Sequence, residues 1–336
     1  MAALARVTNV VQRALGSGKY LGAIWLEGSP FVEETTYWLN LLIDTTVPIA
    51  GNSSQRPHGA IGNDGDRNIV DSVDYITSKI WADESGRDCV GAVAILDEQI
   101  FTSRDVQKAD ARPGGYVATG GHGGVIGRMG HPGTPQFSFK TIKRHTYNSA
   151  VNVTQLPSGV QGSRVQGLKV EAIAVAIKDA DGNLLATAIP KVTIVKHARY
   201  LPEDTSGDAS SEVDILARIA KNLRDAPLAG FVAEGSAPFG AMSNSVDAAL
   251  KSATFSGMPV VKVGRGNAGG FVDATRDPLA IAGNNLTATK ARLLLMACLM
   301  KFGCLPPAVD SAKPTDAETE ATKAKLKQYQ ETFDTH

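Results

Sequence analysis

Short apolar runs alternate with amphipathic stretches along the N-terminal part of the chain. Leu21–Leu26 and Val90–Leu96 are apolar runs of buried-strand type, and Val47–Ala50 is a shorter one. Between them, Glu33–Ile43 and Asp64–Ile80 carry apolar residues at helical spacing. The second helix would present its apolar residues on one face: Ile69, Val70, Val73, Ile76 and Ile80. This rhythm predicts a mostly parallel sheet with helices on both faces.

The same alternation returns in the C-terminal part of the chain, where it predicts a second and smaller α/β domain. The expected strands are Val192–Val195, Gly230–Ala233 and Val260–Val263. The expected helices are Val213–Leu223, Ser245–Ala253 and Thr287–Phe302. The fold class is therefore α/β, with an N-terminal domain over residues 1–145 and a C-terminal domain over residues 191–305.

A connector over residues 146–190 and a tail over residues 306–336 lie outside these domains. Alternating residues at Ala172–Ile177, the turn at Asp181-Gly182-Asn183 and the returning Leu184–Ile189 predict a β-hairpin in the connector. We expect this hairpin to pack on another domain or subunit, because an isolated two-stranded ribbon is marginal in water. The charged tail from Asp316 to Glu331 predicts a solvated surface helix.

The charge and composition argue against several classes of protein. The 336 residues include 34 Lys and Arg and 34 Asp and Glu, so the basic excess typical of nucleic-acid-binding proteins is missing. No apolar run reaches the roughly 18 residues of a transmembrane helix, and no secretory signal is visible, so we expect a cytoplasmic protein. Residues 1–26 lack acidic side chains, which fits either a transit peptide or a surface helix packed on a sheet.

Neither the cysteines nor the histidines have the spacing of a metal site. Cys89, Cys298 and Cys304 are scattered, and no two histidines stand four residues apart on a predicted helix. The glycines of Gly120–Gly124 lack the spacing of a phosphate loop and favour a flexible lid or hairpin. We therefore expect no metal site.

Five segments, in a common order along the chain, resemble the bacterial type I/II L-asparaginase/glutaminase family. The matching stretches are Glu27–Thr35 (EGSPFVEET), Val47–Val73 with its Arg56-Pro57 and Asn63-Asp64-Gly65, Arg104–Lys108 (RDVQK), Ile189–Val192 (IPKV) and Leu286–Leu295 (LTATKARLLL). The resemblance implies an amidohydrolase that releases ammonia from a small amide such as L-asparagine. It also implies a homo-oligomer, either a dimer or a tetramer, with no cofactor.

The departures from the family pattern are as informative as the matches. The family's first strand and its Thr-Gly-Gly-Thr loop, which carries the main nucleophilic threonine, have no counterpart in this sequence. The second catalytic threonine is matched by Ser29, the aspartate beside it by Pro30 and the preceding histidine by Glu27. The asparagine-rich loop of the second domain falls near Pro238–Ala241, without its asparagines. We expect a truncated or divergent member, with an exposed sheet edge beside Leu21–Leu26.

Three hypotheses about function stay open at this point. The chain is an amidohydrolase, with an altered substrate or with a start codon placed too late. It is a family member that binds a small ligand or partner without turnover. It is one part of a split enzyme, in which a second chain supplies the nucleophile segment.

The resemblance also implies which residues carry the chemistry. Ser29 is the matched hydroxyl nucleophile and Lys108 the base that takes its proton, while Gly28, Arg56 and Asp64 are matched to substrate binding. Structural alternatives remain for three of them. Ser29 would be a loop cap, Lys108 would pair with Asp105 or Asp64, and Asp64 would cap the helix that follows Gly65.

Overall fold

The computed structural model describes residues 2–119, 123–131, 133–167, 169–197, 207–236, 239–265, 272 and 277–336. The chain divides into two compact units, Val7–Thr154 and Gln155–Thr335. The first few residues belong with the second unit, and His336 belongs with the first. Each unit has its own sheet.

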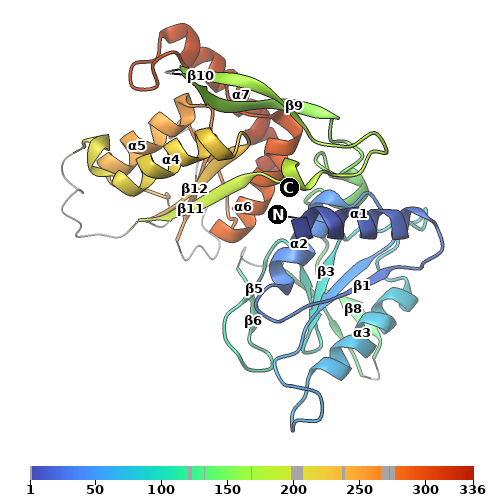
Figure 1. The fold of residues 1–336 in the computed structure, drawn as a ribbon. Coiled ribbons are helices and arrows are strands. Elements are labelled where there is room, and N and C mark those ends of the chain that lie inside the picture. The colour runs from blue at the N-terminus through green and yellow to red at the C-terminus, as the bar shows by residue number, and fades with distance from the viewer. Residues whose placement is uncertain are drawn as a thin grey trace. The chain divides into compact units, whose positions relative to one another are not determined.

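The first unit is built on a six-stranded sheet (Figure 1). Its helices are α1 (Ala2–Gly16), α2 (Val32–Leu42) and α3 (Gly65–Ser78). Its sheet strands are β1 (Ala23–Leu26), β2 (Ile49–Asn52), β3 (Val93–Leu96), β4 (Gln99–Thr102), β7 (Val125–Met129) and β8 (Pro135–Phe137). A separate two-stranded hairpin consists of β5 (Val106–Lys108) and β6 (Tyr116–Ala118).

The strand order of this sheet is β1-β2-β3-β4-β7-β8. Strands β1, β2 and β3 are parallel, whereas β4, β7 and β8 extend the sheet in antiparallel fashion. The α/β fold class is therefore confirmed, but only the first half of this sheet is parallel. β1 stands at the edge of the sheet and pairs with β2 alone among the described strands, whereas the exposure of that edge stays a prediction.

Helices cover both faces of the sheet, as the sequence predicts. Leu15 of α1 and Leu39 of α2 pack with Ile49 on one face. Tyr75 and Ile76 of α3 pack on the opposite face (Figure 1). The core of this unit therefore has two apolar layers, one on each side of the strands.

The orientation of α3 differs from the expected one. Ile69, Val70 and Val73 do not join Ile76 in the core, because their side chains are 39%, 53% and 44% exposed. The buried face of α3 is mostly polar instead: Asn68, Asp71, Ser72, Tyr75 and Ile76. Hydrogen bonds explain the difference. The amide nitrogen Nδ2 of Asn68 donates to the carbonyl of Ser53 at 2.8 Å, and such a bond has no signature in an apolar pattern.

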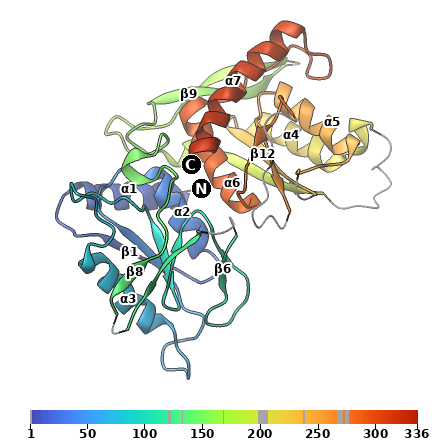
Figure 2. The same ribbon diagram turned by 180° about the vertical axis from the view of Figure 1, so that it is seen from behind.

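The second unit has an all-parallel sheet of four strands, in the order β11-β12-β13-β14. These are β11 (Lys191–Lys196), β12 (Ala229–Gly235), β13 (Val260–Gly264) and β14 (Ile281–Ala282). Its helices are α4 (Val213–Asp225), α5 (Asn244–Phe255), α6 (Ala288–Phe302) and α7 (Asp316–Thr335). Phe231 of β12 packs with α4 and α5, while Gly230 faces Leu295 of α6 on the other side (Figure 2).

The hairpin of the connector forms with a different partner strand. β10 (Lys169–Ala176) pairs with the upstream β9 (Gly159–Gln166), not with Leu184–Ile189. The Asp181-Gly182-Asn183 turn closes only an isolated bridge between Lys178 and Leu184. The prediction failed because β9 is rich in Gly, Gln and Ser and lacks an apolar alternation. The β9–β10 hairpin packs on its own unit, where β9 contacts α4 and α6.

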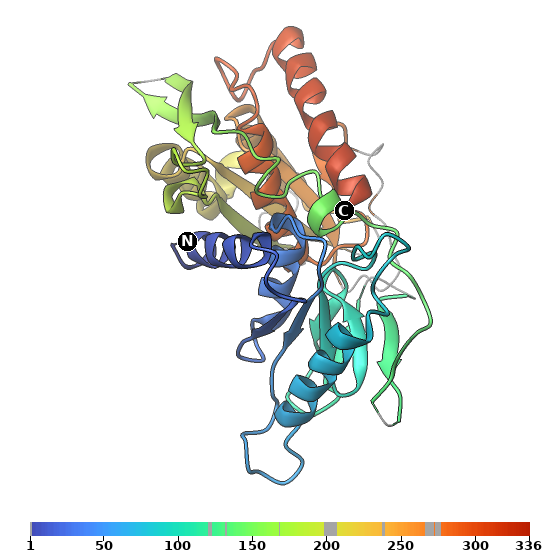
Figure 3. The same ribbon diagram turned by 90° about the vertical axis from the view of Figure 1, so that its right-hand side faces the viewer.

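The tail helix is not a solvated surface helix. α7, the long red helix that leads to the C-terminus in Figure 3, packs against α6 and β14. Tyr329 and Phe333 are fully buried along one face. The charged residues that suggested solvation occupy the other faces, so the amphipathic spacing of Leu326, Tyr329 and Phe333 decides the outcome.

Candidate functional site

The carboxyl ends of β1 and β2 lead into the two loops that carry most of the predicted site residues. Residues 27–31 join β1 to α2, and residues 53–64 join β2 to α3. Because β1 and β2 are adjacent and parallel, both loops begin at the same edge of the sheet, where α/β proteins commonly bind ligands. The main-chain nitrogen of Phe31 donates to the carbonyl of Gly28 at 3.0 Å, which closes a tight turn around Ser29.

Ser29 and Lys108 meet across this site. The side-chain nitrogen Nζ of Lys108 donates to the hydroxyl oxygen Oγ of Ser29 at 2.6 Å. The predicted contact between these two side chains is therefore present. The alternative ion pairs of Lys108 with Asp105 or Asp64 are not formed among the described residues. Asp105 pairs instead with the guanidinium of Arg104 at 2.8 Å.

The backbone of Lys108 is held as well as its side chain. Its main-chain N–H donates to the carboxylate of Glu33, a residue of the first turn of α2 that is 8% exposed. Asp105, at the turn just before β5, accepts the hydroxyl of Thr102 at 2.7 Å. Both ends of the short strand that carries Lys108 are thus anchored by carboxylates.

Tyr116 and Ser53 also belong to the site, and the sequence analysis missed both. The Tyr116 hydroxyl donates to the main-chain carbonyl of Ser29 at 2.7 Å and lies 3.0 Å from the hydroxyl of Ser53. Burial raises the pKa of Tyr116 to about 12, so the phenol keeps its proton at neutral pH. Tyr116 stands directly opposite Lys108 in the β5–β6 hairpin. A sequence-based prediction of the β5–β6 hairpin would have placed Tyr116 beside Lys108.

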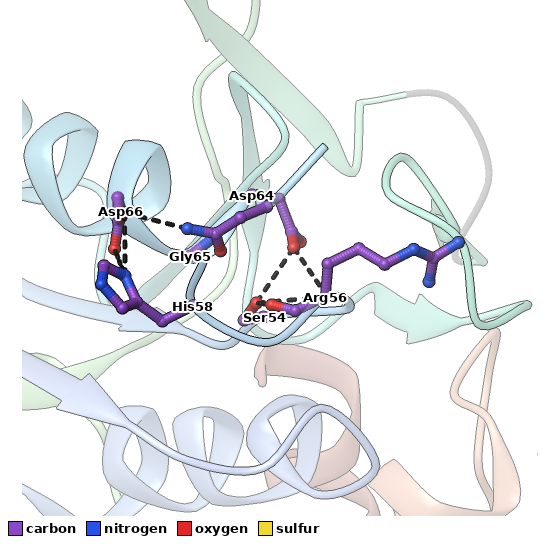
Figure 4. Close-up of polar contacts among 7 residues, drawn as sticks. Ser54, Arg56, His58, Asp64, Gly65 and Asp66 are labelled. Atoms are coloured by element: carbon purple, nitrogen blue, oxygen red, sulfur yellow. Dashed lines mark hydrogen bonds and ion pairs between the residues drawn. The ribbon is translucent and has the colours of Figure 1, made fainter. Parts of the chain in front are cut away.

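Asp64 organises the loop between β2 and α3 (Figure 4). It occupies the N-cap position of α3, but its side chain makes no capping hydrogen bond there. Its carboxylate instead accepts the main-chain N–H groups of Gln55 at 2.9 Å and Arg56 at 3.0 Å, and Ser54 Oγ lies 3.0 Å away. The role expected for Asp64 as a helix cap is therefore replaced by a role as a loop clamp.

Arg56 ties the same loop to the segment that follows β5. Its guanidinium donates to the carbonyl of Ala111 at 2.9 Å and to that of Gln55 at 3.1 Å. Gly65 donates its main-chain N–H to Asn63 at 2.9 Å at the start of α3. The loop is thereby braced against the β5–β6 hairpin.

The remaining charged groups near the site serve local structure. The imidazole nitrogen Nδ1 of His58 lies 3.2 Å from the carboxylate of Asp66, and both side chains are exposed (Figure 4). Glu27 accepts the indole N–H of Trp25 at 2.9 Å. In the part of the chain that the structure describes, His, Cys, Asp and Glu side chains nowhere gather in the groups of three that could hold a metal ion.

Two of the predicted loops lie partly outside the described residues. Residues 120–122 of the glycine-rich Gly120–Gly124 segment are outside them, and so is Pro238 of the segment matched to the family's asparagine-rich loop.

None of the described helices has the length and apolar character needed to cross a lipid bilayer.

Comparison with known proteins points to one family. Residues 1–126 match the family model "Asparaginase, N-terminal". The glutaminase-asparaginase of Acinetobacter glutaminasificans is 27% identical over 150 residues, which are 44% of this chain and 41% of that protein. L-asparaginase 2 of Bacillus subtilis is 24% identical over 306 residues, 89% of this chain and 66% of that protein.

Solved structures agree at the level of the fold. The crystal structure of a probable cytoplasmic L-asparaginase from Campylobacter jejuni matches with a TM-score of 0.68 and 22% identity, covering 99% of this chain and 85% of that chain. The matched regions of the first two relatives span less than two thirds of their own length.

Proposed function

We propose that this chain, which belongs to the asparaginase family, is an amidohydrolase that releases ammonia from a small amide such as L-asparagine. The names of its relatives, L-asparaginase and glutaminase-asparaginase, support this class of substrate. The observation that carries the proposal is the 2.6 Å contact between Lys108 Nζ and Ser29 Oγ.

This contact suits nucleophilic catalysis on an amide. The amine of Lys108 would take the Ser29 hydroxyl proton as Oγ attacks the amide carbon. Lys108 would then return that proton to the departing nitrogen, which leaves as ammonia, while Ser29 keeps the acyl group as an ester. Attack by water on the ester would release the carboxylate and restore the Ser29 hydroxyl.

The developing oxyanion needs hydrogen-bond donors near Ser29. The main-chain N–H groups of Gly28 and Ser29 make no hydrogen bond within the described residues, so we propose that they bind the substrate carbonyl. We assign Asp64 and Arg56 to the wall of the substrate site, as the residues that shape the loop beside it. Gly28 suits this place because it brings the backbone close to a ligand without a side chain.

Pro30 favours a second candidate function, ligand binding without turnover. It directly follows Ser29 and offers neither a carboxylate nor an N–H. We therefore expect slow turnover even in the unaltered chain.

The test is ammonia release from L-asparagine and L-glutamine by the purified chain. We expect Ser29→Ala to lower the rate by about a thousandfold or more, and Lys108→Met by roughly a hundredfold or more. Ser17→Ala and Lys19→Met are matched controls, because both residues lie in the exposed loop after α1. Equal rates in Ser29→Ala and the unaltered chain would refute the assignment of the nucleophile.

A negative result in that assay still separates the two functions. If no ammonia appears but L-asparagine raises the melting temperature, the ligand-binding function is favoured. The dimer or tetramer implied by the family resemblance and the cytoplasmic location expected from the sequence stay predictions. Light scattering of the purified chain would check the first of them.

A further inference from the structure

Ser29 is held by two residues that face each other across one hairpin. Lys108 of β5 and Tyr116 of β6 are cross-strand partners. The first reaches the hydroxyl of Ser29 at 2.6 Å, and the second reaches its main-chain carbonyl at 2.7 Å. One rigid pair therefore contacts both the reacting atom of Ser29 and the backbone that carries it.

The hydroxyl groups around Tyr116 form a chain with a fixed direction. A phenol has one proton, and Tyr116 donates it to the carbonyl of Ser29. Ser53, 3.0 Å away, must then donate its own proton to the Tyr116 oxygen. Both side chains are buried, with Tyr116 5% and Ser53 7% exposed, so this order does not depend on surface water. These two hydrogen bonds link the loop that follows β1 to the loop that follows β2.

Ser29 has little else to fix its backbone. Within the described residues, the bond from Tyr116 is the one hydrogen bond that the main chain of Ser29 makes. The next residue, Pro30, has no N–H to contribute. The side-chain bond to Lys108 fixes the rotamer of Ser29 only if the backbone beneath it stays in place.

We propose that Tyr116 is a positioning residue that sets the Ser29 backbone so that its hydroxyl points at Lys108. The proposal rests on the proposed function, in which Ser29 is the nucleophile. Tyr116 itself does not touch the reacting atoms. Its phenol also stays protonated at neutral pH, because burial raises the pKa to about 12.

The test compares Tyr116→Phe with Tyr75→Phe. Tyr75 is a matched control in the same unit, because it is fully buried and its hydroxyl has no hydrogen-bond partner in the described structure. We expect Tyr116→Phe to lower kcat about 10- to 100-fold, with KM changed less than about twofold, since small displacements of reacting groups cost rate more than binding. The pH profile should keep its shape. Tyr75→Phe should match the unaltered chain.

A second measurement does not depend on amide turnover. A fluorophosphonate probe labels an activated serine, and its labelling rate at Ser29, followed by mass spectrometry, should fall in Tyr116→Phe by a factor similar to that of kcat. Ser53→Ala leaves in place the hydrogen bond that Tyr116 donates to Ser29, so kcat and the labelling rate should fall less, about a few-fold. Unchanged kcat and unchanged labelling in Tyr116→Phe would overturn the proposal.

Failure of the proposed function would look different. In that case the unaltered chain neither releases ammonia nor accepts the probe. The positioning role is then decided by crystal structures of the unaltered chain and Tyr116→Phe. We expect the Ser29 hydroxyl to leave Lys108 in the variant, and a contact retained at hydrogen-bond distance would overturn the inference.

Discussion

The two units fill the space beneath their helices in different ways, and α3 and α4 show the contrast. The buried face of α3 is led by Asn68, Asp71 and Ser72, whereas that of α4 is led by Ile215, Ile219 and Leu223. The inner face of α3 bonds to the loops that follow β2 and β3. The inner face of α4 packs in an apolar cluster with Phe231 of β12.

The difference separates two ways of using a helix. An apolar inner face stabilises a sheet by burial, and it tolerates changes in the loops beyond it. A polar inner face fixes the backbone of particular loops, because each buried donor and acceptor must find its partner. In this molecule the polar face lies under the loop that carries Ser53 and Asp64, next to the candidate site.

The largest change in the free energy of unfolding should come from a substitution in the apolar cluster of the second unit. Phe231 is fully buried between β12 and the helices α4 and α5. Phe231→Ala removes most of a large side chain and leaves a cavity, so we expect the free energy of unfolding to fall by about 3–5 kcal/mol. Chemical denaturation followed by circular dichroism would measure the loss.

Phe139→Ala is the control for that substitution. Phe139 is 53% exposed, so the same change should alter the free energy of unfolding by no more than about 0.5 kcal/mol. Equal losses in the two variants would mean that burial does not distinguish these positions.

How far the sequence predicts the fold follows from the same contrast. In the second unit, the apolar periods that predict Val213–Leu223 and Thr287–Phe302 correspond to α4 and α6, because packing is what holds them. In the first unit, the apolar residues of α3 led to the wrong face. Asn68 and Ser72 point inward there for hydrogen bonds that join distant segments, and a local pattern does not record such bonds.

The site follows a similar rule. Ser29 and Lys108 were found through their match to a family, because each stands in a recognisable short segment. Tyr116 and Ser53 were missed, since neither has a motif of its own and each acts through a partner far away in the sequence. The loop-clamp role of Asp64 was also invisible, because its acceptors are used by main-chain groups of Gln55 and Arg56.

Two carboxylates should respond to pH with opposite sign, the buried Asp88 in the first unit and the half-buried Asp277 in the second. In the first unit, burial raises the pKa of Asp88 from 3.8 to about 7, against the main-chain N–H groups of Val90 and Gly91. In the second, burial tends to raise the pKa of Asp277, but its hydrogen bond to Lys262 and the charge of that lysine outweigh burial and lower it.

The signs follow from proton linkage. Folded Asp88 binds a proton more tightly than unfolded Asp88, so its contribution to the free energy of unfolding falls as pH rises from about 4 to about 7. Asp277 behaves in the opposite way, since its contribution is present above its unfolded pKa and is lost as pH falls through the lowered folded pKa.

The measurement is the melting temperature against pH for the unaltered chain, Asp88→Asn and Asp277→Asn. We expect Asp88→Asn to reduce the decline between about pH 4 and pH 7, and to shift the melting temperature by a few degrees at neutral pH. Asp277→Asn should remove part of the loss at acid pH. If the melting temperature of both variants depends on pH as it does in the unaltered chain, neither carboxyl titrates as proposed.

The smallest and sharpest test replaces one fully buried asparagine in each unit. Asn68 uses its side chain well, because Nδ2 donates to the Ser53 carbonyl at 2.8 Å and Oδ1 accepts the main-chain N–H of Asp97 at 2.9 Å. The side chain of Asn222 on α4 lacks such partners. Its Nδ2 lies 4.0 Å from the sulfur of Met258, and its Oδ1 has no hydrogen-bond partner in the described structure.

The same substitution to leucine should therefore act in opposite directions at these two asparagines. Asn68→Leu leaves the buried carbonyl of Ser53 and the partly buried N–H of Asp97 without their partner, so the free energy of unfolding should fall by about 1–3 kcal/mol. It should also disturb the loop at Ser53 and slow any ammonia release. Asn222→Leu removes an unsatisfied oxygen from an apolar cluster and should be neutral or stabilising by up to about 1 kcal/mol. Urea denaturation of both variants decides the matter, and a comparable loss at Asn222 would show that the contrast between the two helices is not one of hydrogen bonding.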